Sequence, residues 1–280
     1  MPTLYKINRQ CGNLVRKIMY LEEKLHENVY LYSDVLDDPA RLIRLIEELD
    51  EDESVQAVIP EWGFWFSNTQ DGHSFGSKKD FALDALEGLE SDRKADVEWV
   101  VGQIRGAIEK ISAAFYADHE EEGEPNVSPF AGMMKYRPGC DMGAHFDAQA
   151  GDESLKWSII VYVNDDYDGG ELSFIIRPYD LRNPKNGHLQ PKKEATDPAN
   201  KDLVDFTIKP KAGQALIFPS THPYKHQVHL MKNGDKYMFP GFIFQREFDS
   251  SSPESREKYN AGSGYRDVNA EIKYLDDDQE

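Results

Sequence analysis

The chain has 280 residues, of which 39% are hydrophobic and 11% aromatic, and this is enough apolar material for the core of one large domain. No stretch approaches the roughly 18 consecutive apolar residues of a membrane helix, and residues 1–6 lack the basic and apolar segments of a secretory signal. With 32 basic and 51 acidic residues the net charge is −19, which disfavours nonspecific binding to nucleic acid and to anionic membranes.

These totals predict a cytoplasmic protein that does not associate with membranes. The two cysteines, Cys11 and Cys140, exclude a fold built on disulfides. They allow one disulfide, and reduced thiols are the simpler interpretation. The chain is therefore expected to depend on its hydrophobic core for stability.

Residues 1–125 are predicted to form a mostly helical region that supports a second, β-rich region. Asp38 and Pro39 have the residue types of an N-cap and a first helical position, and apolar residues then recur at helical spacing: Leu42, Leu45, Ile46 and Leu49. A longer helix is predicted over residues 97–116 from a stripe of apolar residues typical of a buried helix face. Between the two helices, the aromatic residues 61–66 predict a strand or a buried loop, and residues 70–76 predict a loop.

From residue 126 to 248 the pattern changes to short apolar strands separated by Gly, Pro, Asn and Asp. The predicted strands are residues 130–136, 155–163, 171–176, 203–208, 214–218, 225–230 and 237–244. Many short strands with such breaks are typical of an all-β sandwich or barrel-like core. Two polar segments do not fit strands: residues 177–202 are interpreted as an inserted loop that acts as a mobile lid, and residues 249–280 as a peripheral tail.

His145 and Asp147 are metal-ligand residue types two positions apart. On an extended backbone the side chains at i and i+2 point to the same side, so an imidazole and a carboxylate can approach one ion. His226, on a later predicted strand, supplies a third ligand type. Two histidines and one carboxylate form the facial triad of non-haem iron(II) oxygenases, which leaves coordination positions open. His-x-Asp alone also fits a surface pair or a hydrogen-bonded pair, so the surrounding motifs decide.

Four blocks surround these residues in order. Residues 136–147 read Tyr-Arg-Pro-Gly-Cys-Asp-Met-Gly-Ala-His-Phe-Asp, residues 168–174 read Asp-Gly-Gly-Glu-Leu-Ser-Phe, and residues 212–218 read Ala-Gly-Gln-Ala-Leu-Ile-Phe. In the fourth block, Lys236 follows His226 by ten positions. On these blocks the chain resembles the prolyl 4-hydroxylase-like branch of the iron(II)/2-oxoglutarate-dependent oxygenase superfamily, over about residues 31–244 and most strongly from Met133 onward.

The resemblance implies a mainly β fold with flanking helices, in which residues 126–248 form a double-stranded β-helix, or jelly roll. The Fe(II) ligands that it implies are His145, Asp147 and His226. It implies that Lys236 pairs with the distal carboxylate of 2-oxoglutarate, to which Tyr136 donates its hydroxyl. It also implies O2 as a cosubstrate and ascorbate as a reductant. Less specific candidates for the pocket are Thr221, Tyr162 and Gln245.

The distal histidine must be chosen from His222, His226 and His229. His226 gives the ten-residue step to Lys236 that the family shows. His222 would place Lys232 at the same step, but its Thr-His-Pro context is typical of a loop. His229 has the opposite parity to His226 and should face the other side of a regular strand. His226 is therefore the predicted ligand, with the other two as alternatives.

The substrate is less well defined than the chemistry. Gln227 follows His226 where the prolyl hydroxylases have alanine, Phe242 and Phe244 stand where a tryptophan is usual, and the insertion at 177–202 has no counterpart. The first expectation is hydroxylation of a prolyl or other residue of a peptide or protein. A small amino acid or metabolite is the next, and a nucleic acid is disfavoured by the charge.

Two other classes of function remain open. The chain could be a non-catalytic jelly-roll binding module, or a cupin-like metal dioxygenase that does not need 2-oxoglutarate. An intact triad together with Lys236 disfavours the first, and the His-x-Asp spacing disfavours the second. The sequence does not determine the oligomeric state or the pathway.

Overall fold

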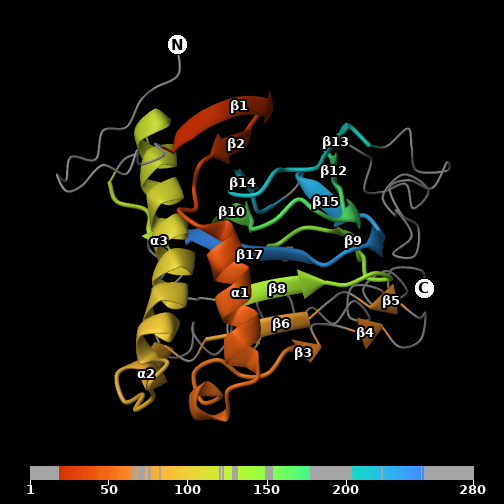
Figure 1. Ribbon diagram of the computed structural model, residues 1–280. Helices are drawn as coiled ribbons and strands as arrows, with labels where there is room; N and C mark the ends of the chain where they lie inside the picture. Colours follow the sequence, from red (N-terminus) through yellow and green to blue (C-terminus); the bar gives the residue numbers. More distant parts are fainter. Residues whose placement is uncertain are drawn as a thin grey trace, which may run out of the picture.

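The computed structural model describes residues 19–64, 67–68, 73–74, 77–81, 83–119, 121, 123–127, 132–148, 154–176, 204–221, 223–246 and 248 (Figure 1). The predicted lid, the predicted tail, Cys11 and His222 lie outside these residues. Among the described residues, no helix is both long enough and apolar enough to cross a membrane.

Eight strands of the described region form a jelly roll of two antiparallel sheets. They are β8 (Gly132–Tyr136), β9 (Met142–His145), β10 (Leu155–Tyr162), β12 (Leu172–Ile175), β13 (Phe206–Ile208), β14 (Ala215–Pro219), β15 (Lys225–Val228) and β17 (Lys236–Phe244). The large sheet contains the order β14-β10-β17-β8, and the small sheet is β13-β12-β15-β9. Strands that follow one another in sequence mostly alternate between the two sheets, which is the connectivity of a double-stranded β-helix. The predicted fold class is confirmed.

Alternate residues of the large sheet face two different cores, as expected for strands covered on both sides. On β10, Ile159 and Val161 pack in the cluster that includes the helices, whereas Ile160 and Tyr162 pack in the interior between the two sheets. On β17, Phe239 belongs to the first cluster and Met238 to the second. Even-numbered residues of these strands therefore point into the jelly-roll interior.

Two helices cover the outer face of the large sheet (Figure 1). Helix α1 (Pro39–Asp50) begins as predicted, because the Asp38 carboxylate accepts a hydrogen bond from the Arg41 N–H at 3.0 Å, and its four predicted apolar residues are buried. Helix α3 (Lys94–Asp118) contains the second predicted helix and buries its apolar stripe. A short helix α2 (Leu83–Leu86) and a 3-10 turn at Glu53–Val55 lie between them.

The N-terminal region contains strands that the sequence patterns did not predict. β1 (Tyr20–His26) and β2 (Val29–Ser33) form a hairpin, and β2 pairs with β14, so the region extends the large sheet. Two register shifts interrupt the β1–β2 pairing, and they break the alternation by which strands are recognised. At the other edge, β6 (Ser77–Asp80) pairs with β8, and β3 (Gly63–Phe64), which lies within the predicted strand or buried loop of residues 61–66, pairs with β6. The remaining short strands are β4 (Ser67–Asn68), β5 (His73–Ser74), β7 (Asn126–Val127), β11 (Asp168–Gly169) and β16 (Met231–Asn233).

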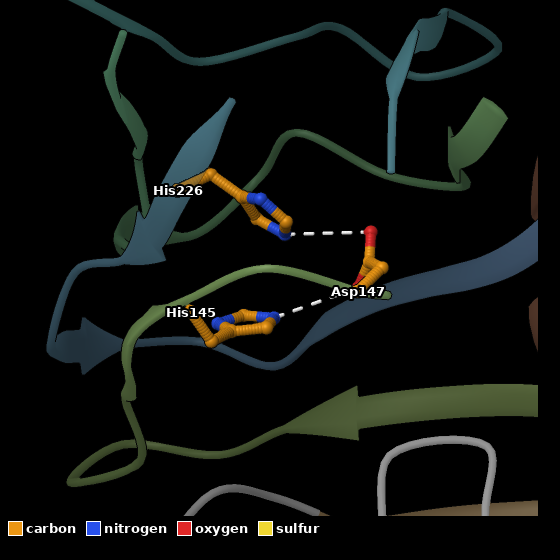
Figure 2. Close-up of side chains that lie close together, drawn as sticks. All are labelled: His145, Asp147 and His226. Atoms are coloured by element: carbon orange, nitrogen blue, oxygen red, sulfur yellow. Dashed lines mark ion pairs between the residues drawn. The ribbon is translucent and has the colours of Figure 1, made fainter. Parts of the chain in front are cut away.

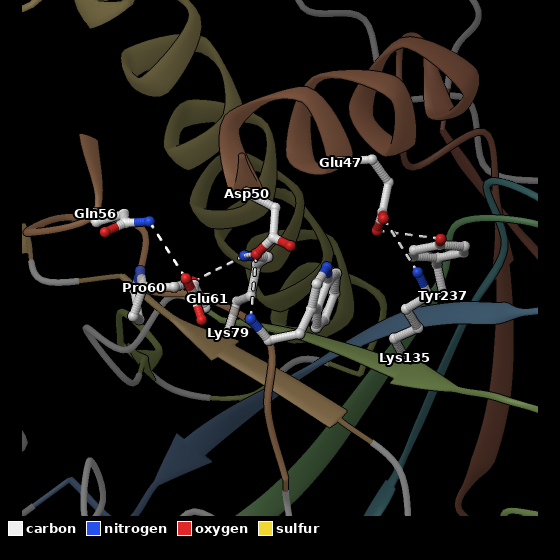
Figure 3. A network of polar contacts seen from close by, with 9 residues as sticks. Glu47, Asp50, Gln56, Pro60, Glu61, Lys79, Lys135 and Tyr237 are labelled. Atoms are coloured by element: carbon white, nitrogen blue, oxygen red, sulfur yellow. Dashed lines mark hydrogen bonds and ion pairs between the residues drawn. The ribbon is translucent and has the colours of Figure 1, made fainter. Parts of the chain in front are cut away.

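A polar network joins α1 to the outer face of the large sheet (Figure 3). Lys79, which is fully buried, donates to the Asp50 carboxylate and, at 2.7 Å, to the Pro60 carbonyl. Lys135 lies 3.1 Å from Glu47 of the same helix. Burial lowers the pKa of Lys79 in spite of its hydrogen bond to Asp50. The ammonium group therefore depends on its partner to remain charged in the folded state.

Replacing Asp50 with alanine should lower the free energy of unfolding by roughly 3 kcal/mol, because it leaves a buried ammonium without its carboxylate. It also removes the acceptor of the Trp62 N–H, which lies 3.1 Å away. Urea unfolding measures the change. Glu48→Ala on the same helix removes only exposed ion pairs with Arg44 and Arg93, and should cost less than about 1 kcal/mol. Equal losses in the two variants would contradict the assigned role of Asp50.

Candidate active site

The three predicted metal ligands converge inside the jelly roll. His145 is the last residue of β9, Asp147 follows in the loop, and His226 is the second residue of β15. β9 and β15 are neighbours in the small sheet, and His226 pairs directly with His145. One ligand atom from each of the three side chains lies within 4.8 Å of the other two. Figure 2 shows the two imidazole rings turned toward the Asp147 carboxylate.

The separations within this cluster suit ligands of one ion. His145 Nε2 lies 3.6 Å from one Asp147 carboxylate oxygen, and His226 Nε2 lies 3.7 Å from the other. The two ring centroids are 4.3 Å apart. Two ligands at about 2.1 Å from one metal ion lie on the order of 3 Å apart, so small side-chain rotations would bring the three groups onto an ion. The residues present therefore fit a metal with a mixed imidazole and carboxylate ligand set.

A backbone carbonyl selects the ring nitrogen that His226 presents. His226 Nδ1 lies 3.3 Å from the Tyr224 carbonyl oxygen, to which it can donate only as Nδ1–H. The Nε2 lone pair then points toward Asp147, where it could bind a metal. Tyr224 is itself held, because its hydroxyl donates to the Glu27 carbonyl at 3.0 Å and accepts from the Asn28 side chain at 2.9 Å. The tip of the β1–β2 hairpin thus supports the outer shell of the site.

The surroundings of Asp147 favour its ionised form. Burial by itself would raise the pKa of the Asp147 carboxyl, but the nearby His226 and His145 lower it by more, to well below its usual range. The group is therefore a carboxylate at any working pH, as a metal ligand must be.

His229, the alternative that lies among the described residues, does not join the cluster. His229 lies on β15's continuation and pairs through Nε2 with the Ser173 hydroxyl at 2.6 Å and through Nδ1 with Glu171 at 3.6 Å. The parity argument against His229 is consistent with this placement.

Lys236, the predicted cosubstrate ligand, is fully buried at the start of β17 and pairs in register with Tyr136 on β8. Its ammonium donates to the Gly170 carbonyl at 2.7 Å and lies 5.4, 5.1 and 5.8 Å from the ring centroids of Tyr136, Tyr162 and Tyr167. Among the described residues, no carboxylate forms an ion pair with it. Burial lowers the pKa of Lys236 to about 7.

Two buried hydroxyls next to Lys236 have no hydrogen-bond partner among the described residues, those of Tyr162 and Tyr167. The Tyr136 hydroxyl is only 3.5 Å from the Met142 sulfur, which is a weak acceptor. Unpaired buried hydroxyls cost free energy, so natural sites rarely leave them unused. An ammonium group and hydroxyl donors that lie together in an apolar interior fit the carboxylate of a ligand.

The sequence patterns missed Tyr167 and named Tyr162 only as a weaker candidate. Tyr167 lies two residues before the Gly169-Gly170 turn, and the Gly170 carbonyl accepts a hydrogen bond from Lys236. The position of Tyr167 next to this turn is the sequence feature that could have indicated its role. Both glycines have positive φ, and a Cβ on Gly170 would lie 3.3 Å from the Lys236 side chain. The other weaker candidates, Thr221 and Gln245, are exposed.

The fold and the convergent side chains define a jelly-roll protein with a candidate metal centre. Residues 131–244 match the family model described as the 2OG-Fe(II) oxygenase superfamily. The matched segment spans the jelly-roll strands from β8 to β17 and contains the His–Asp–His cluster and Lys236.

Solved structures similar to the chain include a Pseudomonas putida prolyl-4-hydroxylase, with 16% identity, 78% of this chain and 93% of that chain covered, and a TM-score of 0.42. A viral collagen prolyl hydroxylase from Paramecium Bursaria Chlorella virus-1 has 15% identity, coverage of 79% and 97%, and a TM-score of 0.43. A prolyl hydroxylase from Trichoplax adhaerens has 14% identity, coverage of 78% and 83%, and a TM-score of 0.44. Among curated proteins, none matches the chain.

Proposed function

We propose that the chain is an Fe(II)- and 2-oxoglutarate-dependent hydroxylase. His145, Asp147 and His226 would hold the iron, and Lys236 with Tyr136 would hold the distal carboxylate of 2-oxoglutarate. The observation that carries the proposal is that one jelly-roll interior contains both the His–Asp–His cluster and a buried lysine with no carboxylate partner among the described residues. The match of residues 131–244 to the superfamily supports it.

The bound iron, with 2-oxoglutarate and O2, would supply the oxidising power for hydroxylation of a C–H bond, with succinate and carbon dioxide as coproducts. The protein's part is binding, orientation and exclusion of water. Asp147 offsets part of the metal charge, and three protein ligands leave positions open. Phe218 and Phe174 lie 4.9 and 5.9 Å from the His226 ring and keep that side of the site apolar. Lys236 fixes the far end of the cosubstrate by a charge-assisted hydrogen bond.

Anaerobic titration tests the cofactor pair without knowledge of the substrate. The protein loaded with Fe(II) should develop a visible charge-transfer band when 2-oxoglutarate is added, and admission of O2 should yield succinate. An iron-loaded, folded protein without the band would contradict the proposal and favour a cupin-like site. A band without any succinate, even with candidate substrates present, would favour a binding module.

The substrate that we propose is a prolyl or other residue of a peptide, and a small amino acid or metabolite is the second candidate. The four sequence blocks support this order, and the net charge of −19 disfavours a nucleic acid. Succinate release, with ascorbate present as reductant, should rise with a proline-containing peptide and not with the same peptide carrying alanine. If free amino acids rather than the peptide increase succinate release, the protein would be a small-molecule hydroxylase.

The affinity for 2-oxoglutarate should depend on pH through Lys236. The free protein has a Lys236 pKa of about 7, lowered mainly by burial, whereas a bound carboxylate requires the ammonium form. Binding above pH 7 must therefore take up a proton, and the affinity should fall by up to about tenfold per pH unit there and stay flat below. Titration of the chelate band between pH 6 and 9 measures this. Lys236→Arg should flatten the profile, since arginine stays charged.

A further inference from the structure

Two buried serines, Ser158 next to the Asp147 carboxylate and Ser220 next to Ser158, take no part in the proposed ligand set. Ser158 belongs to β10, and Ser220 directly follows β14. Each exposes only 1% of its surface, and their hydroxyl oxygens are 2.8 Å apart. Hydroxyls placed in an apolar interior cost free energy unless they are hydrogen-bonded. Each of the two hydroxyl groups is therefore expected to form hydrogen bonds inside the protein.

The direction of the hydrogen bonds follows from the donors and acceptors present. A hydrogen bond from the Ser158 hydroxyl is one of the contacts that lower the pKa of the Asp147 carboxyl, and the ionised carboxylate can only accept. A hydroxyl has a single proton, so Ser158 cannot also donate to Ser220. Ser220 must therefore donate to Ser158, and the two hydroxyls form a directed chain that ends on Asp147.

The backbone adds a second connection at the same place. The Ala148 N–H, next to Asp147, donates to the Ser220 carbonyl at 2.9 Å, and the Ser220 N–H donates to the Lys156 carbonyl at 3.2 Å. The two histidine ligands lie on the small sheet, whereas Ser158 lies on the large sheet and Ser220 follows the end of one of its strands. The position of the carboxylate relative to the histidines is thus set by contacts with the opposite sheet.

We propose that Ser158 and Ser220 are positioning residues that orient the Asp147 carboxylate for metal binding. The inference rests on the proposed function, because it assumes that Asp147 is a metal ligand. Ligating carboxylates are usually held by hydrogen bonds from outer residues, and loss of such a partner typically weakens metal binding by about 10- to 100-fold. Without the Ser158 donor, the carboxylate can rotate about its side-chain bonds and meet the ion in several geometries.

Titration with Mn(II), a redox-stable probe for this type of ligand set, tests the inference through the loss of the free-ion magnetic resonance signal. Ser158→Ala should weaken Mn(II) binding by about 10- to 100-fold. Ser220→Ala should weaken Mn(II) binding less, because Ser158 can still donate its hydroxyl proton to Asp147. Ser158→Thr should bind Mn(II) nearly as the wild type does, because threonine keeps a hydroxyl group. Ser112→Ala is the matched control: Ser112 is fully buried in α3, and its hydroxyl donates to the Ile108 carbonyl at 2.8 Å.

The outcomes separate this inference from the proposed function. Wild-type protein that binds no Mn(II) would overturn the metal centre and the inference together. Wild-type binding with unchanged affinity in Ser158→Ala would overturn the inference alone. Thermal unfolding without metal shows whether each variant folds. If Ser158→Ala does not fold, Ser220→Ala decides: an affinity no weaker than that of Ser112→Ala overturns the inference, and a weaker one supports it.

Discussion

Asp147→Ala should reduce Fe(II) or Mn(II) affinity by at least about 100-fold, since it removes a ligand and not only an outer partner of one. The substitution also leaves His145 and His226 without the anion that offsets the metal charge. The charge-transfer band with 2-oxoglutarate and the release of succinate should both disappear. Anaerobic metal titration followed by visible spectroscopy measures these losses.

Asp165→Ala provides a control for this variant, because Asp165 is an exposed carboxylate of the same jelly roll. It should bind metal as the wild type does. Metal affinity that is the same in Asp147→Ala and Asp165→Ala would show that the His–Asp–His cluster is not the binding site. Circular dichroism of the metal-free proteins separates loss of a ligand from loss of folding.

Lys236→Met should weaken 2-oxoglutarate binding by roughly 100- to 4000-fold, because a buried carboxylate that loses its charged partner costs about 3–5 kcal/mol. Metal affinity should remain near the wild-type value, since Lys236 is not among the clustered ligands. A chelate-band titration with 2-oxoglutarate measures the effect. An unchanged affinity for 2-oxoglutarate in Lys236→Met would show that Lys236 does not bind the cosubstrate.

The same variant should have the opposite effect on the stability of the unliganded protein. The pKa of Lys236 is lowered from its usual value of 10.5 to about 7 in the folded state, mainly by burial. The unfolded chain therefore binds the proton more readily, and the lysine destabilises the fold increasingly as pH falls from about 10 to 7. Methionine removes this cost, so Lys236→Met should unfold at a higher urea concentration at pH 7. A lower urea midpoint for Lys236→Met than for the wild type would indicate that Lys236 stabilises the fold in the absence of ligand.

Much of the fold followed from sequence patterns of sufficient length. The helix at residues 39–50 and the longer α3 have regular apolar stripes, and seven of the core strands are apolar runs between turn residues. β9, which carries His145, was missed because Met-Gly-Ala-His has neither alternation nor β-branched residues. It forms a strand because it pairs with β15, and such pairing is decided by packing between distant segments.

The candidate site divides in the same way. The sequence by itself determined which residue types were available and in which order: the His-x-Asp pair, the distal histidine and the lysine ten positions later. Each of these motifs is a short stretch of sequence, and its residue types and spacing are enough to indicate metal and cosubstrate ligands. Only the tertiary structure decided that the Lys236 ammonium lies near the Tyr167 ring and that Ser158, next to Asp147, meets Ser220. These contacts join residues from different strands, and strand register and sheet packing, which set them, depend on the whole chain.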